Sequence, residues 1–312
     1  MRKTALDCVH ELAKVDERVV FVGSDLGPGV LAKMRAEFPE RWYMEGVSEQ
    51  HIVGMAAGLA MEGFVPYVNT IATFLTRRCY EQVAVDLCIH DLPVRLIANG
   101  GGGVYAPLGP THLAIEDIAI MRALPNMTVV VPCDADEMRR FMHRTADWPH
   151  PIYIRLAKGG DPVVSDAAHG FEIGRSIRMR EGADGLFVTT GVMTQVALAA
   201  AAALEAEGVR VGVRHVHTVK PLDAEGILAD VARVPAVVTV EEGILSGGLG
   251  TAVLEACSTD APAHLPKVAR IGIPDAFPDQ YGSQQSLLAH WDITPASLAD
   301  AMRARRRAAG AR

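Results

Sequence analysis

Short, continuously apolar runs alternate with helical periods along almost the whole chain. In the first half the apolar runs lie at residues 18–24, 64–71, 93–99, 127–132 and 151–156. Between them, apolar residues recur with helical spacing over residues 48–62, 74–90, 112–123 and 134–146. Apolar strands separated by helices are typical of parallel βαβ units, whose strands are covered on both faces.

The pattern lapses over residues 161–185, which we interpret as a linker with at most a short hairpin in "FEIGRSIRMREG". A second series then follows. Its strands are expected at 186–191, 210–216, 236–242 and 267–273, and its helices at 192–207, 224–233 and 247–257. In a last helix, Thr294 is the expected N-cap and Pro295 the first helical residue. The sequence therefore predicts an α/β protein with two consecutive doubly wound domains, residues 1–160 and 186–312, and mostly parallel sheets.

The composition is that of a globular protein and argues against several functional classes. Hydrophobic residues make up 49% and charged residues 21%, and the net charge of -7 gives no basic footprint for nucleic acid. No apolar run approaches the roughly 18 residues of a membrane span. The first twenty residues predict an amphipathic helix and a strand, not a signal peptide. The five cysteines are scattered without a C-x-x-C pair, so we expect no zinc site, no disulfide framework and a reducing, cytoplasmic location.

Two glycine-rich stretches follow expected strands. "SGGLG" (246–250) opens a helix and could hold an anion, or it could simply allow tight strand-to-helix packing. "NGGGGVYAPLGPTH" (99–112) contains four successive glycines, which cost backbone entropy. That loop therefore needs unusual dihedral angles or close approach to a ligand, unless it is a floppy surface loop. Thr111 is a plausible N-cap, which would place His112 in a first helical turn.

An acidic residue, Glu49, opens a helix made almost entirely of small and apolar residues, "GVSEQHIVGMAAGLAMEG" (46–63). So bare a helix is expected to lie close against another surface. Glu49 also has a plain interpretation, because an acid in the first turn suits the helix dipole and Ser48 can serve as the cap. By default, Phe74 would belong to the core and Arg77 and Arg78 to solvent.

Taken together, the motifs resemble the C-terminal half of transketolase-like thiamine diphosphate enzymes. That group includes transketolase, deoxyxylulose-phosphate synthase and the β subunits of 2-oxoacid dehydrogenases. The matching segments occur in family order and include "GSDLG", "GVSEQHIVGMAAGLAMEG", "TFL", "YEQV", "GPTH", "HTVKPLD", "VTVEEGILSGGLG" and "GIPDAFPDQYG". The likeness is greatest to the separately encoded C-terminal subunit of split transketolases. It implies a pyrimidine-binding domain followed by the family's C-terminal domain.

The resemblance implies a chemical role for Glu49. The matching acid in the family hydrogen-bonds a ring nitrogen of the cofactor's aminopyrimidine and favours the tautomer that generates the reactive ylide. A carboxyl group in an apolar setting has a raised pKa and can share a proton there. Phe74, 25 positions later, matches the aromatic residue on which the pyrimidine stacks. His112 matches a histidine that contacts the donor's hydroxyl groups and can pass protons. Asp25 and Leu26 match the segment that lines the cofactor across a dimer interface.

The resemblance also implies that this chain carries half of a site. The family holds the diphosphate through Mg²⁺ on a separate domain, with a GDG followed some 25 to 30 residues later by Asn, and the chain contains no GDG. The expected partner is an N-terminal, diphosphate-binding subunit that supplies the magnesium site. The expected assembly is an α2β2-like heterotetramer in which the bare helix after Glu49 is buried at an interface.

The expected substrate residues depart in part from the family pattern. Arg2 and Arg155 match phosphate-binding arginines. Asn99 or Gly100 stands where the family has a phosphate-gripping histidine, and Leu108 stands where transketolases carry an Asp for acceptor hydroxyl groups. A leucine there favours a less hydroxylated acceptor. A hydrophobic pocket discriminates by only about 1–3 kcal/mol per methylene, so the acceptor is not identified.

Several activities are compatible with the resemblance. The first is transfer of a two-carbon ketol unit from a ketose or ketose phosphate to an aldehyde-type acceptor, which need not be a standard one. The alternative is the β subunit of a decarboxylating, acyl-transferring 2-oxoacid dehydrogenase. Deoxyxylulose-phosphate synthase matches less well, because its tyrosine before "STF" is Ile71 here and its arginine after "LPV" is absent. A non-catalytic homologue is disfavoured by the presence of Glu49 and Phe74.

Overall fold

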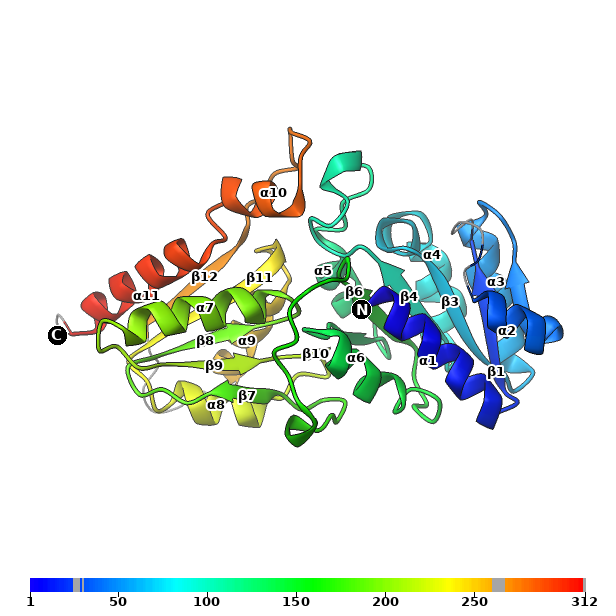
Figure 1. Cartoon of the computed structure of the whole chain (residues 1–312), viewed down its shortest axis with the longest axis horizontal. Helices are drawn as coiled ribbons and strands as arrows, with labels where there is room; N and C mark the ends of the chain where they lie inside the picture. The colour runs from blue at the N-terminus through cyan, green and yellow to red at the C-terminus, as the bar shows by residue number, and fades with distance from the viewer. Residues whose placement is uncertain (25–28, 30, 260–266, 311–312) are drawn as a thin grey trace.

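The computed structural model describes residues 1–24, 29, 31–259 and 267–310. These residues form two sheets, each flanked by helices and placed one after the other along the long axis of the molecule (Figure 1). The first sheet has seven described strands in the order β10-β5-β6-β4-β3-β1-β2, and the second has five in the order β12-β11-β8-β9-β7. The predicted α/β architecture with two doubly wound, mostly parallel sheets is confirmed.

The first sheet is parallel except at one edge. Its strands are β1 (Val19–Gly23), β2 (Trp42–Met44), β3 (Val65–Ile71), β4 (Arg95–Asn99), β5 (Thr128–Val130), β6 (Ile152–Leu156) and β10 (Thr218–Lys220). Of these described strands, only β10 runs antiparallel, beside β5. Because β10 comes from the second half of the chain, that half contributes a strand to the first sheet, which the sequence did not predict.

Helices cover both faces of the first sheet. They are α1 (Arg2–Val15), α2 (Ala32–Glu37), α3 (Glu49–Met61), α4 (Tyr80–Gln82), α5 (Asp117–Ala123) and α6 (Ala135–Met142). Alternate strand residues point to opposite faces. Phe21 and Tyr67 belong to the core shared with α1 and α6, whereas Val22 and Val68 belong to the core under α3.

The second sheet repeats this arrangement. Its strands are β7 (Ile177–Arg180), β8 (Gly185–Thr189), β9 (Val211–His215), β11 (Ala236–Ile244) and β12 (Lys267–Ile273). Its helices are α7 (Met193–Glu205), α8 (Ala224–Val231), α9 (Leu249–Thr259), α10 (Gln284–His290) and α11 (Pro295–Gly310). Helices α7 and α11 pack together on one face, and α8 and α9 on the other (Figure 1). Thr294 caps α11 as predicted, since its Oγ1 accepts the Ser297 backbone N–H at 3.2 Å.

The short hairpin considered possible within residues 161–185 is not seen among the described residues. Strand β7 pairs antiparallel with β9, which lies more than 30 residues later in the chain, and it becomes an edge strand of the second sheet. A local sequence pattern reports that a strand forms but not which distant strand it joins, so the predicted local partner was wrong.

Two predicted helices of the first half are altered. The segment after Thr111 stays in a turn, and α5 starts only at Asp117 with Glu116 at the N-cap position. Thr111 is therefore not a helix cap, and His112 does not lie in a first helical turn. The helix expected over residues 74–90 is mostly π-helical, at Phe74–Arg78 and Val83–Ile89 around the short α4. Such wide turns are frequent at functional sites.

Candidate functional site

The site lies where the strand order of the first sheet reverses. From β1 the chain adds β2 on one side and β3 on the other, so the reversal falls between β1 and β3. Open parallel sheets bind ligands outside the carboxyl ends of their strands at this point. Ser24 follows β1 directly, its N–H donates to the Asn69 carbonyl near the end of β3, and Glu49 begins α3 after β2. Glu49 is thus placed at the crevice by the fold itself.

Glu49 is a buried acid held by two side chains. Only 2% of the residue is exposed. Ser24 Oγ donates to its Oε1 at 3.0 Å, and Arg78 Nη1 donates to its Oε2 at 2.6 Å. Burial acts to raise the pKa of Glu49, but hydrogen bonds from Arg78, from its own backbone N–H and from Ser24 outweigh burial and hold the pKa below its usual value. The expected rise is therefore wrong for the chain alone, because Arg78 was not foreseen.

Phe74 connects Glu49 with His112. The Phe74 ring is half-buried, not part of the closed core. The Arg78 guanidinium carbon lies 4.2 Å from its centroid, and the His112 ring meets it edge-on at 5.4 Å. Thr111 Oγ1 lies 2.9 Å from His112 Nδ1 and orients that ring. Three residues predicted from the sequence, Glu49, Phe74 and His112, are thus brought to one place, with Arg78 between the first two.

Arg77 is engaged with protein, in contrast to the solvated side chain expected by default. It pairs with Glu116 through Nε and Nη2 and donates to the carbonyls of Pro110 and Leu113, both at 3.0 Å. These bonds hold the segment around His112 in a turn and explain the late start of α5. For Arg78, the sequence did contain a signal: it follows Phe74 by four residues in a helical segment, which places both on one face.

The loop of four glycines is buried against the second domain. Gly102 has φ of +65°, and a Cβ there would collide with the Glu242 side chain. Glu242 accepts the Gly103 N–H at 2.9 Å and the Gln284 side-chain amide at 2.6 Å. Burial raises the pKa of Glu242. The unusual dihedrals are therefore confirmed, but the close approach is to the protein's own carboxyl group, and a floppy surface loop is excluded.

A cavity of about 280 Å³ gathers three of the predicted substrate residues. It is lined by Arg2, Asn99, Leu108 and, in addition, Gly100, Val104, Tyr105, Pro107, Ala157 and Lys158. Leu108 is 49% exposed at its rim. Lys158, which the sequence did not single out, adds a second cation to Arg2. The lining is apolar with a few polar groups, as is typical of small-molecule sites.

Arg155 lies outside this cavity. Its Nε donates to Asp117 Oδ2 at 2.8 Å, and its Nη2 donates to the carbonyls of Glu242 at 2.6 Å and Ala114 at 3.2 Å. The side chain is almost fully buried and links the two domains. Holding a substrate phosphate would require Arg155 to give up these contacts. Two further predicted residues, Asp25 and Leu26, lie outside the described part of the chain.

The N-terminus of α9, in the "SGGLG" stretch, is filled by the chain's own carboxyl group. Glu241 accepts the N–H groups of Leu249 at 2.9 Å and Gly250 at 2.8 Å. Burial raises the pKa of Glu241 to about 7 against these hydrogen bonds. The cradle suggested by the sequence thus exists, and an internal acid occupies it.

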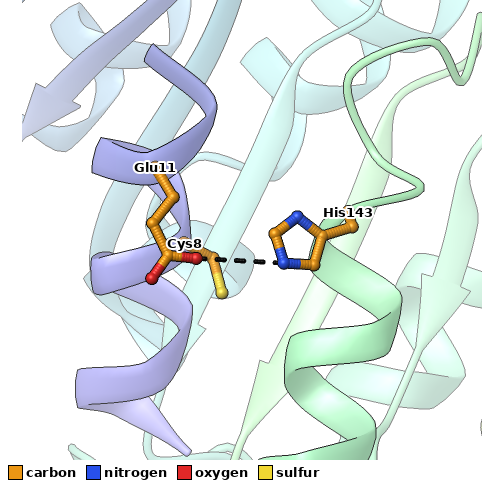
Figure 2. A group of neighbouring side chains, drawn as sticks. All are labelled: Cys8, Glu11 and His143. Atoms are coloured by element: carbon orange, nitrogen blue, oxygen red, sulfur yellow. Dashed lines mark ion pairs between the residues drawn. The ribbon is translucent and has the colours of Figure 1, made fainter. Parts of the chain in front are cut away.

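A group of side chains suited to metal ligation joins α1 and α6 (Figure 2). Cys8, Glu11 and His143 have ligand atoms within 4.8 Å of one another. Arg139 already places Nη1 at 3.1 Å from both Glu11 carboxylate oxygens. Burial raises the pKa of the Cys8 thiol to about 11, so it stays protonated at neutral pH. The group therefore acts as an ion-paired link between the two helices.

A second such group is buried between the domains. Cys133, Glu137 and His215 have ligand atoms within the same distance of one another. His215 Nε2 lies 2.8 Å from Glu137 Oε2, and this carboxylate also accepts the Cys133 N–H at 2.6 Å. Although burial opposes it, the imidazole lowers the pKa of Glu137 to about 2. Glu137 Oε2 is thus taken up by protein contacts, whereas the buried Oε1 has no hydrogen-bond partner among the described residues. In the described ranges, no helix has both the length and the apolar character to cross a bilayer.

Comparison with known proteins assigns both halves of the chain. Residues 1–160 match the family described as "Transketolase, pyrimidine binding domain", and residues 174–298 match "Transketolase, C-terminal domain". A split-gene transketolase, described as an inactive beta4 tetramer, superposes with a TM-score of 0.90 at 35% identity, covering 98% of both chains. A mutant transketolase from Pichia stipitis has a TM-score of 0.78 at 19% identity, which shows the fold alone.

Relatives in sequence agree with the structural match. A putative uncharacterized transketolase family protein of Sinorhizobium fredii is 40% identical over 270 residues, or 85% of this chain and 77% of that protein. A 6-deoxy-6-sulfo-D-fructose transketolase subunit of Clostridium sp. is 34% identical over 89% of this chain and 85% of its own length. A 1-deoxy-D-xylulose-5-phosphate synthase of Geobacter sulfurreducens is 38% identical over 98% of this chain, which spans only 48% of that enzyme. The chain therefore belongs to the transketolase family, whose members depend on thiamine diphosphate.

Proposed function

We propose that this chain holds the aminopyrimidine half of thiamine diphosphate in a two-chain transketolase, and that the pair transfers a two-carbon ketol unit. The observation that carries this proposal is the buried Glu49 carboxyl at the switch-point crevice, within the same cluster as Phe74. Its fit to a cofactor has a further support. The Thr73 hydroxyl, next to Phe74, is buried and has no hydrogen-bond partner among the residues that the structure describes, and buried hydroxyl groups ordinarily have one.

The residues of the chain divide the work. Thiamine diphosphate, when bound, supplies an acidic thiazolium carbon and an electron sink. Glu49 holds or releases a proton at the pyrimidine, in a setting where burial favours the neutral acid once no cation pairs with it. Phe74 provides a flat apolar face. His112, oriented by Thr111, moves a proton at a substrate hydroxyl. The diphosphate and Mg²⁺ are left to the partner chain.

The cavity lined by Arg2, Asn99 and Leu108 suits the substrate. Arg2 and Lys158 give it two cations, and Asn99 gives it an amide. We assign the anionic end of a substrate, such as a phosphate, to Arg2 and Lys158 and not to Arg155, whose guanidinium is already bonded to Asp117. Leu108 at the rim leaves no charged contact for acceptor hydroxyl groups, so a less hydroxylated aldehyde acceptor fits best.

The exposed apolar surface around α3 also supports binding of a second chain type and self-association. Around α3, several large apolar side chains are exposed, namely Val47, Met61, Val85 and Ile89. Adding a Cβ at Gly58 would meet no atom within 4 Å, so that side of the bare helix is free in the single chain. Exposed apolar patches of this kind mark interfaces. An α2β2 assembly would bury them and complete the crevice.

Replacing Glu49 tests the proposal. In the complex reconstituted with a GDG-bearing partner chain, Glu49→Gln should lower kcat at least about 100-fold, because the amide cannot hold or release a proton. Assembly, followed by light scattering, should be unchanged. Glu241→Gln, which alters another buried acid at a helix N-terminus, is the matched control and should keep near-normal turnover. Near-normal turnover of Glu49→Gln would remove the central assignment.

Donor choice separates the activities. A ketose phosphate should be consumed with transfer to an added aldehyde and without release of CO2. If a 2-oxo acid is consumed instead and CO2 appears, the chain belongs to a decarboxylating enzyme, as in the 2-oxoacid dehydrogenase alternative. Glu49 would act in either case, so this experiment decides the reaction and not the site.

A further inference from the structure

Arg78 contacts both groups that the proposed function assigns to the cofactor. Its Nη1 donates to Glu49 Oε2 at 2.6 Å, and its guanidinium carbon lies 4.2 Å above the Phe74 ring. A guanidinium is flat, cationic and rich in N–H donors, and it stacks on aromatic faces. It therefore offers Glu49 and Phe74 the same two kinds of contact, an N–H···O bond and a ring stack, that a flat aminopyrimidine would offer.

We propose that Arg78 is a built-in competitor that occupies the aminopyrimidine's place in the single chain and must swing away before the cofactor binds. This inference rests on the proposed function, because it concerns the same crevice. Two flat groups cannot lie on one face of Phe74 and bond one Glu49 oxygen together, so binding and displacement are linked. The apparent affinity for the cofactor is then reduced by the fraction of molecules in which Arg78 is in place.

The surroundings of Arg78 allow it to leave. Its side chain is 42% exposed, whereas the Glu49 side chain is 2% exposed. When Arg78 moves away, its guanidinium returns to water, and the buried Glu49 carboxylate loses its ion-pair partner. The neighbouring Arg77 differs, since four hydrogen bonds to Glu116, Pro110 and Leu113 tie it down. Among the described residues, the Arg78 side chain makes one hydrogen bond, to Glu49. It is the movable member of the pair.

Displacement would also change the state of Glu49. While Arg78 is in place, its hydrogen bond holds the pKa of Glu49 down, and the acid is an ionised carboxylate. Once Arg78 has left, burial remains as the larger influence and favours the protonated acid. Glu49 would then take up a proton from water, which it could share with the aminopyrimidine. The single chain is thereby kept in a state that is ion-paired and inactive.

The first test is binding of thiamine, the cofactor without its diphosphate, to the full single chain by isothermal titration calorimetry. Arg78→Met should bind thiamine at least tenfold more tightly than the wild type. Arg35→Met is the matched control, because Arg35 also stacks on an aromatic ring, Trp42, but far along the chain on an exposed surface. It should bind as the wild type does. Equal affinities for wild type and Arg78→Met, or binding by neither up to millimolar thiamine, would overturn the proposal.

Two further measurements keep the test decisive. Arg78→Lys keeps the charge but cannot lie flat on Phe74, so its affinity should fall between those of the wild type and Arg78→Met; it serves also if the methionine variant folds poorly. Carboxyl ¹³C NMR should show Glu49 titrating below the usual range in the wild type and above it in Arg78→Met. An unchanged Glu49 titration would equally overturn the proposal. None of these results depends on turnover, so the Glu49→Gln activity test stands or fails separately.

Discussion

The two sheets place a buried glutamate at equivalent points but use it differently. In the first, the strand order reverses between β1 and β3, and in the second between β8 and β11. Glu49 begins the helix α3 near the first reversal, and Glu241 lies at the N-terminus of α9 near the second. Both carboxyl groups are almost completely buried. Their partners differ: Glu241 is held by backbone N–H groups and Glu49 by two side chains.

This difference separates a structural acid from a candidate reactive one. Backbone donors at a helix N-terminus cannot move without unfolding the helix, so the Glu241 site is closed to ligands. The Arg78 side chain can move, so the Glu49 site can be opened. The pKa values follow the same division: burial raises that of Glu241 to about 7, whereas Arg78 keeps that of Glu49 low. Of these two helix N-termini, therefore, only that of α3 can open to a ligand, because the Arg78 side chain that holds Glu49 there can move away.

The largest expected effect comes from forcing the closed site open. A Cβ at Gly248 would collide with the Glu241 carboxylate, so Gly248→Ala should push this acid off its backbone donors. Leaving a buried charged group without partners should lower the free energy of unfolding by roughly 3 kcal/mol. Urea unfolding of the single chain, followed by circular dichroism, measures this loss.

Gly58→Ala, in the helix α3 that Glu49 begins, is the control for Gly248→Ala. An added Cβ there meets no atom within 4 Å. Alanine is the better helix former, so the free energy of unfolding should rise by up to about 1 kcal/mol. If Gly248→Ala were as stable as the wild type, Glu241 would not be clamped in the way that its hydrogen bonds indicate.

The next effect is a pH dependence carried by Glu241. Its folded pKa of about 7 lies above the ordinary value of 4.5. Between these values the folded chain keeps a proton that the unfolded chain has lost, so unfolding releases a proton. The contribution to the free energy of unfolding therefore falls as pH rises from 4.5 to 7, by on the order of 3 kcal/mol, and then levels off. The difference between wild-type and Glu241→Gln unfolding curves isolates it, and a flat difference over this range would contradict the raised pKa.

The sequence predicted the fold and the identity of the central site residues, but it did not predict the contacts that these residues make. Alternating apolar runs predicted the two doubly wound sheets, because parallel strands covered on both faces leave a strong pattern. The ordered motifs pointed to Glu49, Phe74 and His112, which the structure brings into one cluster. Strand β10 could not be foreseen, since a three-residue strand that crosses to the other sheet has no local signature.

The features that the sequence could not show share a physical cause, namely contacts between residues far apart in the sequence. Arg155 matched a phosphate-binding pattern, but its guanidinium is committed to Asp117 and to the Glu242 carbonyl 87 positions later. Charged side chains look solvated in a sequence until the partner that desolvates them is placed. Lys158 was not predicted, because no local pattern marks a lysine whose cavity is completed by the distant residue Arg2.

Removing Arg78 should make Glu49 behave like Glu241. Without its cation, the buried carboxyl has a raised pKa, so the folded state takes up a proton as pH falls. Arg78→Met should cost roughly 1–2 kcal/mol of unfolding free energy at pH 7, and part of this should return by pH 5. The wild-type contribution has the opposite sign: with a lowered folded pKa it is present above pH 4.5 and is lost as pH falls below. Unfolding free energies of both chains across pH 4–8 compare the two slopes. Parallel slopes would mean that Arg78 does not control the acid.

The smallest effect concerns two buried hydroxyl groups, one beside each glutamate's helix. Thr73 precedes Phe74, and Thr239 lies on β11 two residues before Glu241; neither hydroxyl has a hydrogen-bond partner among the described residues. Replacing each by valine removes an unsatisfied polar group while keeping the shape, so both variants should be as stable as the wild type or more stable, by up to about 1 kcal/mol. Thermal unfolding of the single chains measures this.

Activity should then separate the two variants. If the Thr73 hydroxyl is unpaired because it serves the open crevice, Thr73→Val should raise the KM for thiamine diphosphate severalfold in the reconstituted complex, and Thr239→Val should not. An equal response of the two variants would mean that an orphaned hydroxyl marks no site on either sheet, and that the distinction between the open and the closed glutamate rests on Arg78 alone.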